Sequence, residues 1–394
     1  MRKIKVNFII SAMYLGGTEV VLLSYLNNFN FDLYDVTLTI TRKMYEAECF
    51  PSKLSSKVNL IYLQKYRFLN KIRIKKKLNY KINFYDKQLN SILLSPISKY
   101  IIKKEFKKID DLVDIHIDFD SSWFYSHNKP FISFMHFSLT SKTRRGLLKT
   151  LSTIDDSASV ILLNEDMMDE FVRLPLINIQ SKCHVIYNPF NISKIRHLAL
   201  EQLKESSILS GVYIVTVCRL DEKQKDVTTL IKAFQILRND FGYLGNLVVV
   251  GDGHSKHDLM NLATRLDVKD FVIFLGSQLN PYKFIYNAQL FVLSSKYEGF
   301  GNVLVEALAI GTPIVATDCP VGPRVILDNG NAGILTPVGD AMAMAKSINS
   351  VLTDSDIKLN LLSRATQHVE KFSVDKVLPR FYKIINNILS VRNN

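Results

Sequence analysis

Short apolar runs separated by amphipathic, helix-like stretches recur along both halves of the chain. In the first half these runs occupy residues 6–10, 36–41, 58–63, 114–119, 130–136, 159–164 and 184–187. In the second half they occupy residues 213–217, 246–250, 271–275, 290–293, 313–316 and 333–336. Strands that alternate with helices are typical of βαβ units and a parallel sheet. The pattern therefore predicts an α/β fold with two doubly wound sheets.

The two series of runs also divide the chain. At 394 residues it is longer than a single hydrophobic core usually supports. We predict an N-terminal Rossmann-like domain over residues 1–190 and a second Rossmann-like domain over residues 191–375. Residues 376–394 are predicted to form a helix that packs back on the first domain. In such sheets ligands bind beyond the carboxyl ends of the strands.

Composition narrows the class of protein. With 47% hydrophobic and 22% charged residues, the chain is an ordinary folded protein. No apolar run approaches the roughly 20 residues of a membrane-spanning helix, and residues 6–10 are too short for a signal peptide. The cysteines are widely spaced and predict buried thiols in a reducing compartment: Cys49, Cys183, Cys218 and Cys319. We therefore expect a cytoplasmic protein.

The positive charge is concentrated in one segment. Residues 51–110 contain sixteen Lys or Arg and three Asp or Glu, a net charge of +13 that equals the net charge of the whole chain. Leu, Ile, Phe and Tyr are interleaved with the lysines, most densely over residues 71–87. This mixture favours an anionic membrane surface as the partner of the basic segment 65–108. Nucleic acid and a merely solvated basic face are the alternatives.

A glycine-rich turn lies at the centre of the second series. Residues 291–295 form the apolar pattern of a buried strand. Gly299 and Gly301 follow it, and because they lack side chains the backbone there can approach a ligand closely. A helix is predicted over Asn302–Ile310. A helix that begins on a glycine-rich turn offers amide groups and a positive dipole end to a phosphate.

Two carboxylates flank this turn. Glu298 precedes it and Glu306 lies inside the helix, among apolar residues that would bury most of the helix. Amides that donate hydrogen bonds to a phosphate, placed between two carboxylates that accept them from hydroxyl groups, would suit a nucleotide-sugar as the ligand. The alternative is that both acids are solvated surface residues.

Basic residues follow the first strand of the second series. In the sequence CRLDEKQKD, residues 218–226, Arg219 and Lys225 are cations at a strand's carboxyl end, where a diphosphate can lie between them. Lys223 is the alternative to Lys225.

The first domain has a glycine pair of its own. Gly16 and Gly17 open a helix, which permits close approach to a phosphate or a sugar, although a tight turn without a ligand is the alternative. The full G-x-G-x-x-G fingerprint is absent here and at residues 251–254, so nicotinamide binding is poorly supported.

The remaining candidates lie at strand ends of the first domain. His136 ends a strand and is expected to point toward the ligand, whereas His116 and His184 are expected to be structural. Asp118 and Asp120 form a D-x-D pair, for which we favour acceptor binding and keep a divalent metal as the alternative.

Together these residues resemble the retaining glycosyltransferases of group 1, family four, whose GT-B fold has two Rossmann-like domains facing a central cleft. The resemblance spans most of residues 1–375 and is strongest over 211–340. It is carried by the E-x7-E pair Glu298 and Glu306 within YEGFGNVLVEALAIGTPIVATD, by the Arg219 and Lys225 pair, and by Gly16-Gly17. The later sequence CPVGPRVIL departs from the family, which commonly has an acid at the position of Val325.

The resemblance implies that residues 1–190 bind the acceptor and residues 191–375 the nucleotide-sugar donor, and it implies a role for each site residue. Glu298 would bind hydroxyls of the donor sugar, Glu306 those of the ribose, and His136 would lie near the sugar. Arg219 and Lys225 would neutralise the leaving diphosphate. The remaining donor-binding positions would be Gly16, Gly17, Gly276, Ser277, Phe300, Gly301, Asn302 and Val303. The family retains the anomeric configuration and generally uses neither metal nor cofactor.

The resulting hypothesis is a peripheral enzyme of the inner membrane face. It would transfer a hexosyl or N-acetylhexosaminyl group from a nucleotide diphosphate donor, for which we favour a UDP-sugar. The acceptor would be a lipid-linked or cell-surface polysaccharide or lipopolysaccharide. A sugar-nucleotide epimerase of the same architecture is the alternative, and a nucleic-acid-binding protein is a weaker one. A metal-dependent transferase that uses Asp118 and Asp120 also stays open.

Overall fold

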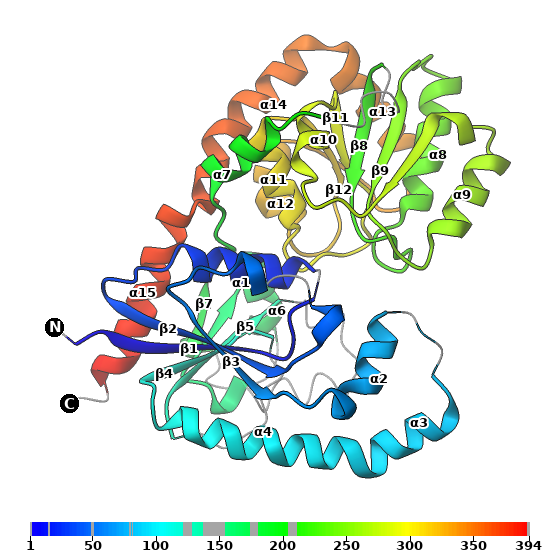
Figure 1. The fold of residues 1–394 in the computed structure, drawn as a ribbon. Helices are drawn as coiled ribbons and strands as arrows, with labels where there is room; N and C mark the ends of the chain where they lie inside the picture. Colours follow the sequence, from blue (N-terminus) through cyan, green and yellow to red (C-terminus); the bar gives the residue numbers. More distant parts are fainter. Residues whose placement is uncertain are drawn as a thin grey trace. The chain divides into compact units, whose positions relative to one another are not determined.

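The computed structural model describes residues 2–14, 16–48, 51–78, 80, 82–120, 128–136, 154–173, 180–203 and 211–391. The chain divides into two compact units (Figure 1). Unit 1 comprises Met1–Leu163, Met168–Pro189 and Val377–Asn394, and unit 2 comprises Asn164–Met167 and Phe190–Lys376. Cys49 and residues 204–210, the last part of the polar, partly helical connection that we predict over residues 190–210, lie outside the described residues.

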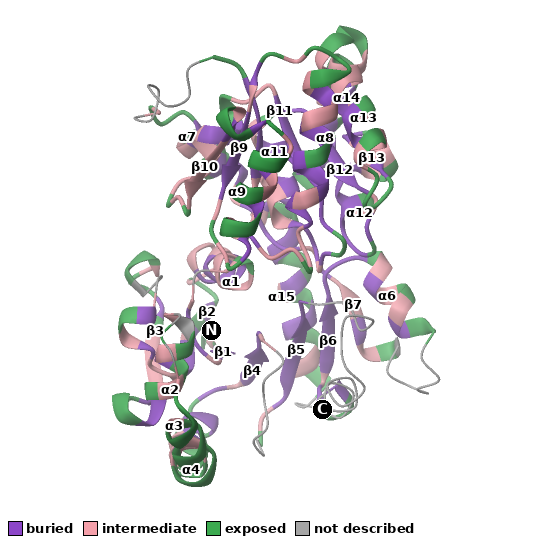
Figure 2. Ribbon diagram, turned by 90° about the vertical axis from the view of Figure 1, so that its right-hand side faces the viewer, coloured by how far each residue is buried: buried purple, intermediate pink, exposed green. Residues whose placement is uncertain are grey.

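Unit 1 is built on a parallel sheet of seven strands. Their order is β3-β2-β1-β4-β5-β6-β7. Most residues of the central strands are buried on both faces, as expected for a sheet covered by helices (Figure 2). The strands are β1 (Ile4–Ile10), β2 (Tyr34–Arg42), β3 (Asn59–Gln64), β4 (Ile115–Asp118), β5 (Phe131–Met135), β6 (Ser159–Leu162) and β7 (Cys183–Val185).

The Lys-rich segment forms helices between β3 and β4, where the sequence predicts a helical insertion. A buried face of α4 packs on the sheet beside β3 through Ile102, Phe106 and Ile109. The helices of unit 1 that lie in the first half of the chain are α1 (Gly17–Asn27), α2 (Arg67–Lys77), α3 (Phe84–Leu89), a π-helical turn (Asn90–Leu94) and α4 (Ser95–Asp110). Helix α6 (Glu165–Val172) begins in unit 2 and ends in unit 1.

The last helix of the chain, α15 (Val374–Val391), belongs to unit 1 for nearly all its length. Phe381 is fully buried and meets the rings of Tyr25 and Phe134 at centroid distances of 5.3 and 5.5 Å. The Tyr382 hydroxyl accepts a hydrogen bond from the backbone amide of Asn30 at 2.8 Å. The chain's end is therefore part of the core of unit 1.

Unit 2 is built on a second parallel sheet, of six strands, in the order β10-β9-β8-β11-β12-β13. Buried Val, Leu and Ile side chains from this sheet and from α8, α9, α13 and α14 form one continuous core cluster. The strands are β8 (Tyr213–Val217), β9 (Asn246–Val250), β10 (Val272–Gly276), β11 (Leu290–Leu293), β12 (Ile314–Thr317) and β13 (Ile334–Thr336). The helices are α7 (Ile192–Ala199), α8 (Val227–Asn239), α9 (Lys256–Arg265), α10 (Tyr282–Tyr286), α11 (Asn302–Ile310), α12 (Pro323–Ile326), α13 (Ala341–Thr353) and α14 (Ser355–His368).

The thirteen predicted strands are all present and lie in two parallel sheets, so the predicted fold class is confirmed. Three of them have the predicted bounds, and the ends of the others differ from the prediction by at most two residues. The predicted helix over Asn302–Ile310 has the observed bounds of α11. Helix α1 begins at Gly17, so the second glycine of the pair is helical and only Gly16 lies in the preceding loop. In the described part of the chain, no helix has the length and apolar character needed to cross a bilayer.

Candidate functional site

The carboxyl ends of β8 and β11 define the candidate site of unit 2. These two strands are neighbours in the sheet. After β8 the chain passes to β9, on the far side of β8, and after β11 it passes to β12, on the far side of β11. The loops that follow them therefore diverge, and this switch in strand order is where doubly wound sheets bind ligands. Arg219 and Lys225 follow β8, and Glu298 follows β11.

Lys225 and Glu298 form a largely buried ion pair. The distance from Lys225 Nζ to Glu298 Oε1 is 2.5 Å, and the side chains are 15% and 7% exposed. The loops that carry them are also joined directly, because Ser294 Oγ donates to the Lys225 carbonyl at 2.9 Å. Asp226 follows Lys225 in a left-handed conformation and ends the loop at the start of α8. The structure thus joins two residues that are 73 positions apart in sequence.

One oxygen of Glu298 carries all of the side-chain contacts that the described residues make with this carboxylate. Oε1 accepts from Lys225 Nζ and, at 2.6 Å, from Ser295 Oγ. No described residue donates a hydrogen bond to Oε2. A carboxylate oxygen accepts two hydrogen bonds, so Oε2 retains its capacity for the hydroxyl groups of a ligand.

Arg219 is the exposed cation of this site. Its side chain is 66% exposed, and Nη2 donates to Gln224 Oε1 at 3.1 Å and lies 3.4 Å from Asp221 Oδ2. Gln224 in turn donates to the Tyr297 carbonyl at 3.3 Å. These contacts hold the guanidinium in the same pair of loops as Lys225, with most of its surface open to an anion.

The glycine-rich turn between β11 and α11 is closely packed. Gly301 has a φ of +94° at the N-terminus of α11, a conformation that only glycine adopts without cost. Phe300 is buried with its ring edge against Phe372, at a centroid distance of 5.9 Å. A Cβ on Gly322, whose φ is +105°, would lie 2.1 Å from the Phe300 carbonyl oxygen. The turn therefore fits against the loop after β12 only while both positions are glycine.

The first turn of α11 follows directly. Asn302 and Val303 are half-buried there, and amides in the first turn of a helix have no partners within it. The Gly299 carbonyl accepts a hydrogen bond from Asn164 Nδ2 at 3.3 Å, which fixes the start of the turn. The amides of this turn and the helix dipole make a site suited to an anion.

Glu306 lies one turn further along α11 and differs sharply from Glu298. Removal from water raises its pKa to about 7, and the Tyr282 hydroxyl, at 3.4 Å, is the only group among the described residues that donates a hydrogen bond to its carboxylate. The neighbouring Glu306 charge and burial raise the pKa of Tyr282. Val305 and Ala307 on either side are fully buried, as predicted, and Glu306 itself is half-buried.

Gly276 and Ser277 lie at the end of β10. Gly276 has a φ of +69° and accepts a hydrogen bond from the Gly251 amide at 2.8 Å. Ser277 is exposed in the loop that leads to α10 and thus to Tyr282. They occupy the same carboxyl edge of the sheet as Arg219 and Glu298, two strands from β8.

The other predicted site residues belong to unit 1. Gly16 is extended, and a Cβ there would meet Glu19 Oε2 at 2.5 Å. Glu19 Oε1 accepts a hydrogen bond from the Tyr14 amide at 3.3 Å. Gly17 is exposed at the start of α1. A Cβ at Gly16 would displace only the end of the flexible Glu19 side chain, and a ligand role for the glycine pair stays a prediction.

His136 follows β5 and is buried rather than exposed. Its ring lies against Phe119 and Phe134 at centroid distances of 4.6 and 5.8 Å. Burial lowers its pKa to about 4, partly offset by a hydrogen bond to the Phe119 backbone, so the ring is neutral. Nε2 has no hydrogen-bond partner among the described residues. Its predicted contact with the donor sugar stays a prediction.

Asp118 and Asp120 occupy different surroundings. Asp118 is buried at the end of β4, and Asp120 Oδ2 accepts a hydrogen bond from the Ser11 amide at 2.9 Å. In the parts of the chain that the structure describes, no group of three or more His, Cys, Asp or Glu side chains is arranged to bind a metal ion. Whether these two residues contact an acceptor stays a prediction.

His116, which we expected to be structural, lies in a buried polar chain. His116 Nε2 lies 3.0 Å from Asp110 Oδ1, and Asn7 Nδ2 lies 3.1 Å from His116 Nδ1. Thr39 Oγ1 donates to Asn7 Oδ1 at 2.7 Å, which links β2, β1, β4 and the end of α4. The expectation for His116 is therefore confirmed.

Four supporting residues were missed by sequence reasoning. Ser295 is three positions before Glu298, a spacing that often brings a hydroxyl to a carboxylate, and it was available as a signal. Tyr282 and Asn164 are distant in sequence from the groups they contact. Asp318, the last residue of the stretch YEGFGNVLVEALAIGTPIVATD, forms an ion pair with Arg324, the residue before the Val325 at which the sequence departs from the family.

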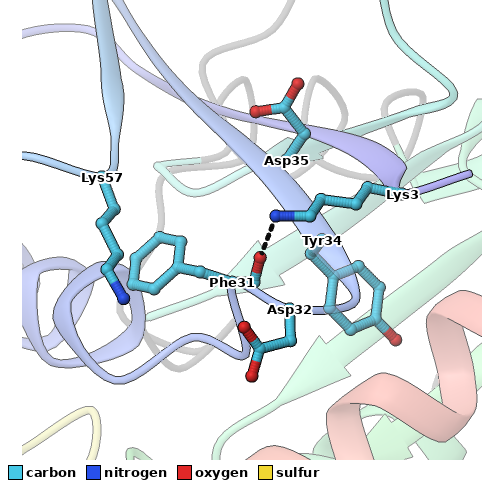
Figure 3. Close-up of a pocket in the computed structure, with 6 residues that line it drawn as sticks. All are labelled: Lys3, Phe31, Asp32, Tyr34, Asp35 and Lys57. Atoms are coloured by element: carbon cyan, nitrogen blue, oxygen red, sulfur yellow. Dashed lines mark hydrogen bonds between the residues drawn. The ribbon is translucent and has the colours of Figure 1, made fainter.

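A pocket of about 310 Å³ lies elsewhere, in unit 1 (Figure 3). Lys3 Nζ donates to the Phe31 carbonyl at 2.7 Å, and Lys57 Nζ lies 5.5 Å from the centre of the Phe31 ring. Its other lining residues are Asp32, Tyr34 and Asp35. The lysines already have partners, and no predicted site residue lines the pocket.

Part of the chain is similar to a known protein family. Residues 201–369 match the model of the glycosyl transferases group 1 family. The chain is 30% identical over 232 residues to the Campylobacter jejuni N-acetylgalactosamine-N,N'-diacetylbacillosaminyl-diphospho-undecaprenol 4-alpha-N-acetylgalactosaminyltransferase, covering 58% of this chain and 60% of the relative. It is 29% identical over 191 residues to the Rhizobium meliloti lipopolysaccharide core biosynthesis glycosyltransferase LpsE, covering 48% of this chain and 54% of that protein. The chain thus spans only a little over half the length of these relatives.

Solved structures resemble the chain over nearly its full length. Anabaena HepE in complex with UDP and glucose has a TM-score of 0.76 at 18% identity and covers 98% of this chain and 100% of its own. The lipopolysaccharide outer core galactosyltransferase WaaB in its apo form has a TM-score of 0.67 at 18% identity, covering 99% and 100%. These likenesses and the two parallel sheets establish the GT-B fold.

Proposed function

With a group 1 glycosyltransferase domain over residues 201–369 and the GT-B fold as premises, we propose that this chain is a retaining glycosyltransferase that uses a UDP-sugar. The observation that carries the proposal is the cluster at the carboxyl ends of β8 and β11. There an exposed Arg219, the Lys225–Glu298 pair and the glycine-rich start of α11 combine cations, a hydroxyl acceptor and amides. A nucleoside diphosphate sugar needs these three kinds of group.

Each group has a defined task in the proposed reaction. Arg219, Lys225 and the amides of residues 300–303 bind the diphosphate, Glu298 Oε2 accepts hydroxyls of the sugar, and Glu306 accepts those of the ribose. Gly276 and Ser277 bind the base. For unit 1, we keep Gly16, Gly17 and His136 as donor-binding residues, on the ground of the family resemblance alone. Fixed cations and amides stabilise a leaving anion without reorganising, and this electrostatic stabilisation is often the main source of rate acceleration in such enzymes.

The chemical step balances without a protein nucleophile. The bond between the anomeric carbon and the phosphate oxygen breaks, and the acceptor oxygen bonds to the same face of that carbon. The acceptor's proton passes to an oxygen of the departing diphosphate. Glu298 is held by Lys225 and Ser295, so its task is to position the sugar rather than to attack it.

We propose a lipid-linked glycan or glycolipid as the acceptor, reached at the cytoplasmic face of an anionic membrane. The Campylobacter relative is named for an undecaprenol-linked substrate and the Rhizobium relative for the lipopolysaccharide core, which supports this class. The basic segment 65–108 supports the membrane part, because Lys103, Lys104 and Lys107 are exposed on the outer side of α4. Nucleic acid is the competing partner for this segment.

The test is a panel of UDP- and GDP-sugars, first screened by thermal shift and then incubated with a lipid-linked acceptor. We expect one UDP-sugar to raise the melting temperature and to yield UDP and a product with the anomeric configuration of the donor. Inversion at the anomeric carbon would contradict retention. Salt-sensitive DNA binding with no turnover of any nucleotide-sugar would contradict the whole proposal.

An epimerase of the same fold is the second candidate, and the same panel separates it. Without acceptor, an epimerase converts the sugar of the UDP-sugar, whereas a transferase at most hydrolyses it slowly. Chelator addition in the same assay tests metal dependence through Asp118 and Asp120, and we expect the rate to be unchanged.

A further inference from the structure

The segment between β3 and β4 exposes an unusual density of apolar side chains. Twenty-five large hydrophobic residues are exposed in the described part of the chain, and ten of them lie within residues 66–100. Figure 2 shows α3 and α4 with mainly exposed residues. The electrostatic attraction proposed above does not account for these side chains.

Six of them form what we call the apolar ridge. Its members, with their exposed fractions, are Tyr85 80%, Leu89 51%, Ile92 75%, Leu93 50%, Ile97 39% and Tyr100 68%. The ridge runs from α3 through the π-helical turn into α4. Tyr85, Leu89, Leu93 and Ile97 are spaced four residues apart. In an α-helix of 3.6 residues per turn, side chains at this spacing move gradually around the helix axis. The π-helical turn has more residues per turn and offsets this rotation, which keeps the ridge on one side of the helix.

The ridge lies on helices that are only partly packed: α2 contacts α4 and the π turn, and Lys75 of α2 pairs with Asp86 of α3. No residue of α3 or of the π turn is buried. The contact of α4 with the sheet begins only at Ser98 and continues through Ile102, Phe106 and Ile109. A helix is usually held by packing of an apolar face, and isolated short helices are marginal in water. The exposed ridge is therefore the apolar face that a partner would cover.

The charges around the ridge identify the partner. Residues 65–108 contain fourteen Lys or Arg and only Asp86 and Glu105 as acids. Lys75 pairs with Asp86 at 2.8 Å, and Lys108 pairs with Glu105 at 2.8 Å, so both acids are neutralised locally. Lysine is depleted at protein interfaces, whereas lysines beside Tyr, Leu and Ile are typical of helices that lie in the headgroup layer of anionic bilayers.

From these observations we propose that the apolar ridge inserts into the acyl boundary of an anionic bilayer, with the lysines of α4 at the phosphates. Binding is then held by burial of the ridge and not by charge alone. This inference deepens the proposed function, on which it rests, because a lipid-linked acceptor is reached from the bilayer surface. It makes the α3–α4 segment the membrane anchor of unit 1.

The test uses the full chain and vesicles of phosphatidylcholine with phosphatidylglycerol at 3:1, or phosphatidylcholine alone. We expect the triple variant Tyr85→Ser, Ile92→Ser, Leu93→Ser to lose at least tenfold in partition coefficient to the 3:1 vesicles. The matched control is Leu244→Ser with Leu359→Ser, which removes two exposed leucines of unit 2 and should bind like the unchanged chain. In 0.5 M NaCl the unchanged chain should keep a measurable part of its binding, because burial of the ridge is not screened.

A reporter at the ridge tests insertion directly. In a Trp123→Phe background, which removes the chain's one tryptophan, Ile92→Trp emission should shift to shorter wavelength on the 3:1 vesicles and be quenched by lipids brominated near the headgroup. Leu244→Trp should show neither effect. An unchanged Ile92→Trp spectrum on bound protein, or equal binding of the triple Ser variant, would overturn insertion.

Two further outcomes distinguish a bilayer from a second copy of the chain as the partner, and failure of the anchor from failure of the proposed function. Absence of vesicle binding together with concentration-dependent dimerisation, lost in the triple Ser variant, would overturn the proposal in favour of a second copy as the partner. Transfer to a short-chain, water-soluble acceptor should be unchanged in the triple variant. If that transfer fails in the unchanged chain while vesicle insertion is observed, the proposed function fails and the anchor stands.

Discussion

The two carboxylates beside the glycine-rich turn have opposite electrostatic surroundings. Glu298 lies against a lysine ammonium and a serine hydroxyl. Among the described residues, Glu306 has only a long hydrogen bond from Tyr282, and removal from water raises its pKa to about 7. A ligand with adjacent hydroxyl groups would supply the donors that Glu306 lacks. We therefore expect Glu298 to be in place before the donor binds and Glu306 to gain its hydrogen-bond partners from the donor.

The raised pKa of Glu306 predicts a pH dependence of donor binding. Hydroxyl groups donate to the carboxylate, so affinity for a UDP-sugar should rise as Glu306 ionises through about pH 7. We expect Kd to fall about threefold to tenfold between pH 6 and pH 8 by calorimetry. A UDP-sugar is the probe of choice, because its phosphates do not titrate there. A flat profile for Glu306→Gln is the control, and a flat profile for the unchanged chain would contradict the role of Glu306.

The same residue predicts a stability effect in the absence of donor. The folded-state pKa lies above the ordinary value for Glu, so the folded protein binds the proton more tightly and loses stability as pH rises from about 4.5 to 7. Glu306→Gln should therefore raise the melting temperature at pH 8, by about 2–4 °C for about 1 kcal/mol. At pH 5, where Glu306 is protonated, the variant and the unchanged chain should melt together. A lower melting temperature at pH 8 would contradict this account.

At the residue scale the sequence predicted functional groups better than their partners. Arg219, Lys225, Glu298 and Glu306 were predicted from spacing and from a family resemblance. Tyr282 was not, because it contacts Glu306 from a segment 24 positions earlier and no periodicity marks it. Hydrogen bonds between loops depend on strand order in the sheet, which a single sequence does not reveal.

At the scale of elements, the turn after β11 is shaped by the loop after β12. Val321 and Gly322 have φ values of +63° and +105°, and the first is uncommon for a β-branched residue. This loop lies against Phe300, and it is fixed from another side because the Gly322 amide donates to Asp166 Oδ2 at 3.2 Å. The position of the amides proposed to bind phosphate thus depends on a strained neighbour.

A substitution at Gly322 tests that dependence. Gly322→Ala places a Cβ 2.1 Å from the Phe300 carbonyl, so the turn must move. We expect UDP affinity to fall at least tenfold by calorimetry, with a melting temperature lower by several degrees. The matched control is Gly339→Ala, where φ is also positive at +79° but nothing lies within 4 Å of the new Cβ. Equal UDP affinity in both variants would show that the loop after β12 does not position the turn.

Element types were well predicted from sequence, while local distortions were not. The thirteen strands and α11 follow from buried apolar runs and glycine positions. The π-helical turn at 90–94 and the left-handed Val321 break local preferences, and no residue pattern there announces them. One lies in the proposed membrane anchor and the other beside the proposed phosphate site, which agrees with the tendency of strained backbone to gather at functional sites.

At the scale of the whole molecule, the chain builds two units and returns to the first. It leaves unit 1 after Pro189 and re-enters it at Val377, so α15 completes a core whose other elements precede residue 190. The sequence predicted this return from the apolar spacing of the last helix. It did not predict the aromatic partners Tyr25, Phe29 and Phe134, because contacts across more than 200 positions leave no local pattern.

The two units should therefore unfold separately, and only one should respond to the donor. Phe381→Ala removes a fully buried ring and should destabilise unit 1 by about 3–5 kcal/mol. In differential scanning calorimetry we expect one transition to move down in this variant and a different transition to move up on addition of UDP. The exposed substitution Leu359→Ala should move neither. A single transition that responds to both changes would contradict independent units.

The central claim is that the ion pair at the carboxyl ends of β8 and β11 is the donor site. Lys225 and Lys223 lie two positions apart, but the Lys225 side chain is buried against Glu298, while Lys223 is exposed and its backbone amide donates to Asp221. The most direct measurement is the rate of UDP release from the accepted UDP-sugar by Lys225→Ala and Lys223→Ala. We predict a loss of at least 100-fold in kcat for Lys225→Ala, as for removal of one charge-stabilising group, and less than a threefold change for Lys223→Ala. Full activity in Lys225→Ala, or equal losses in both variants, would contradict the account.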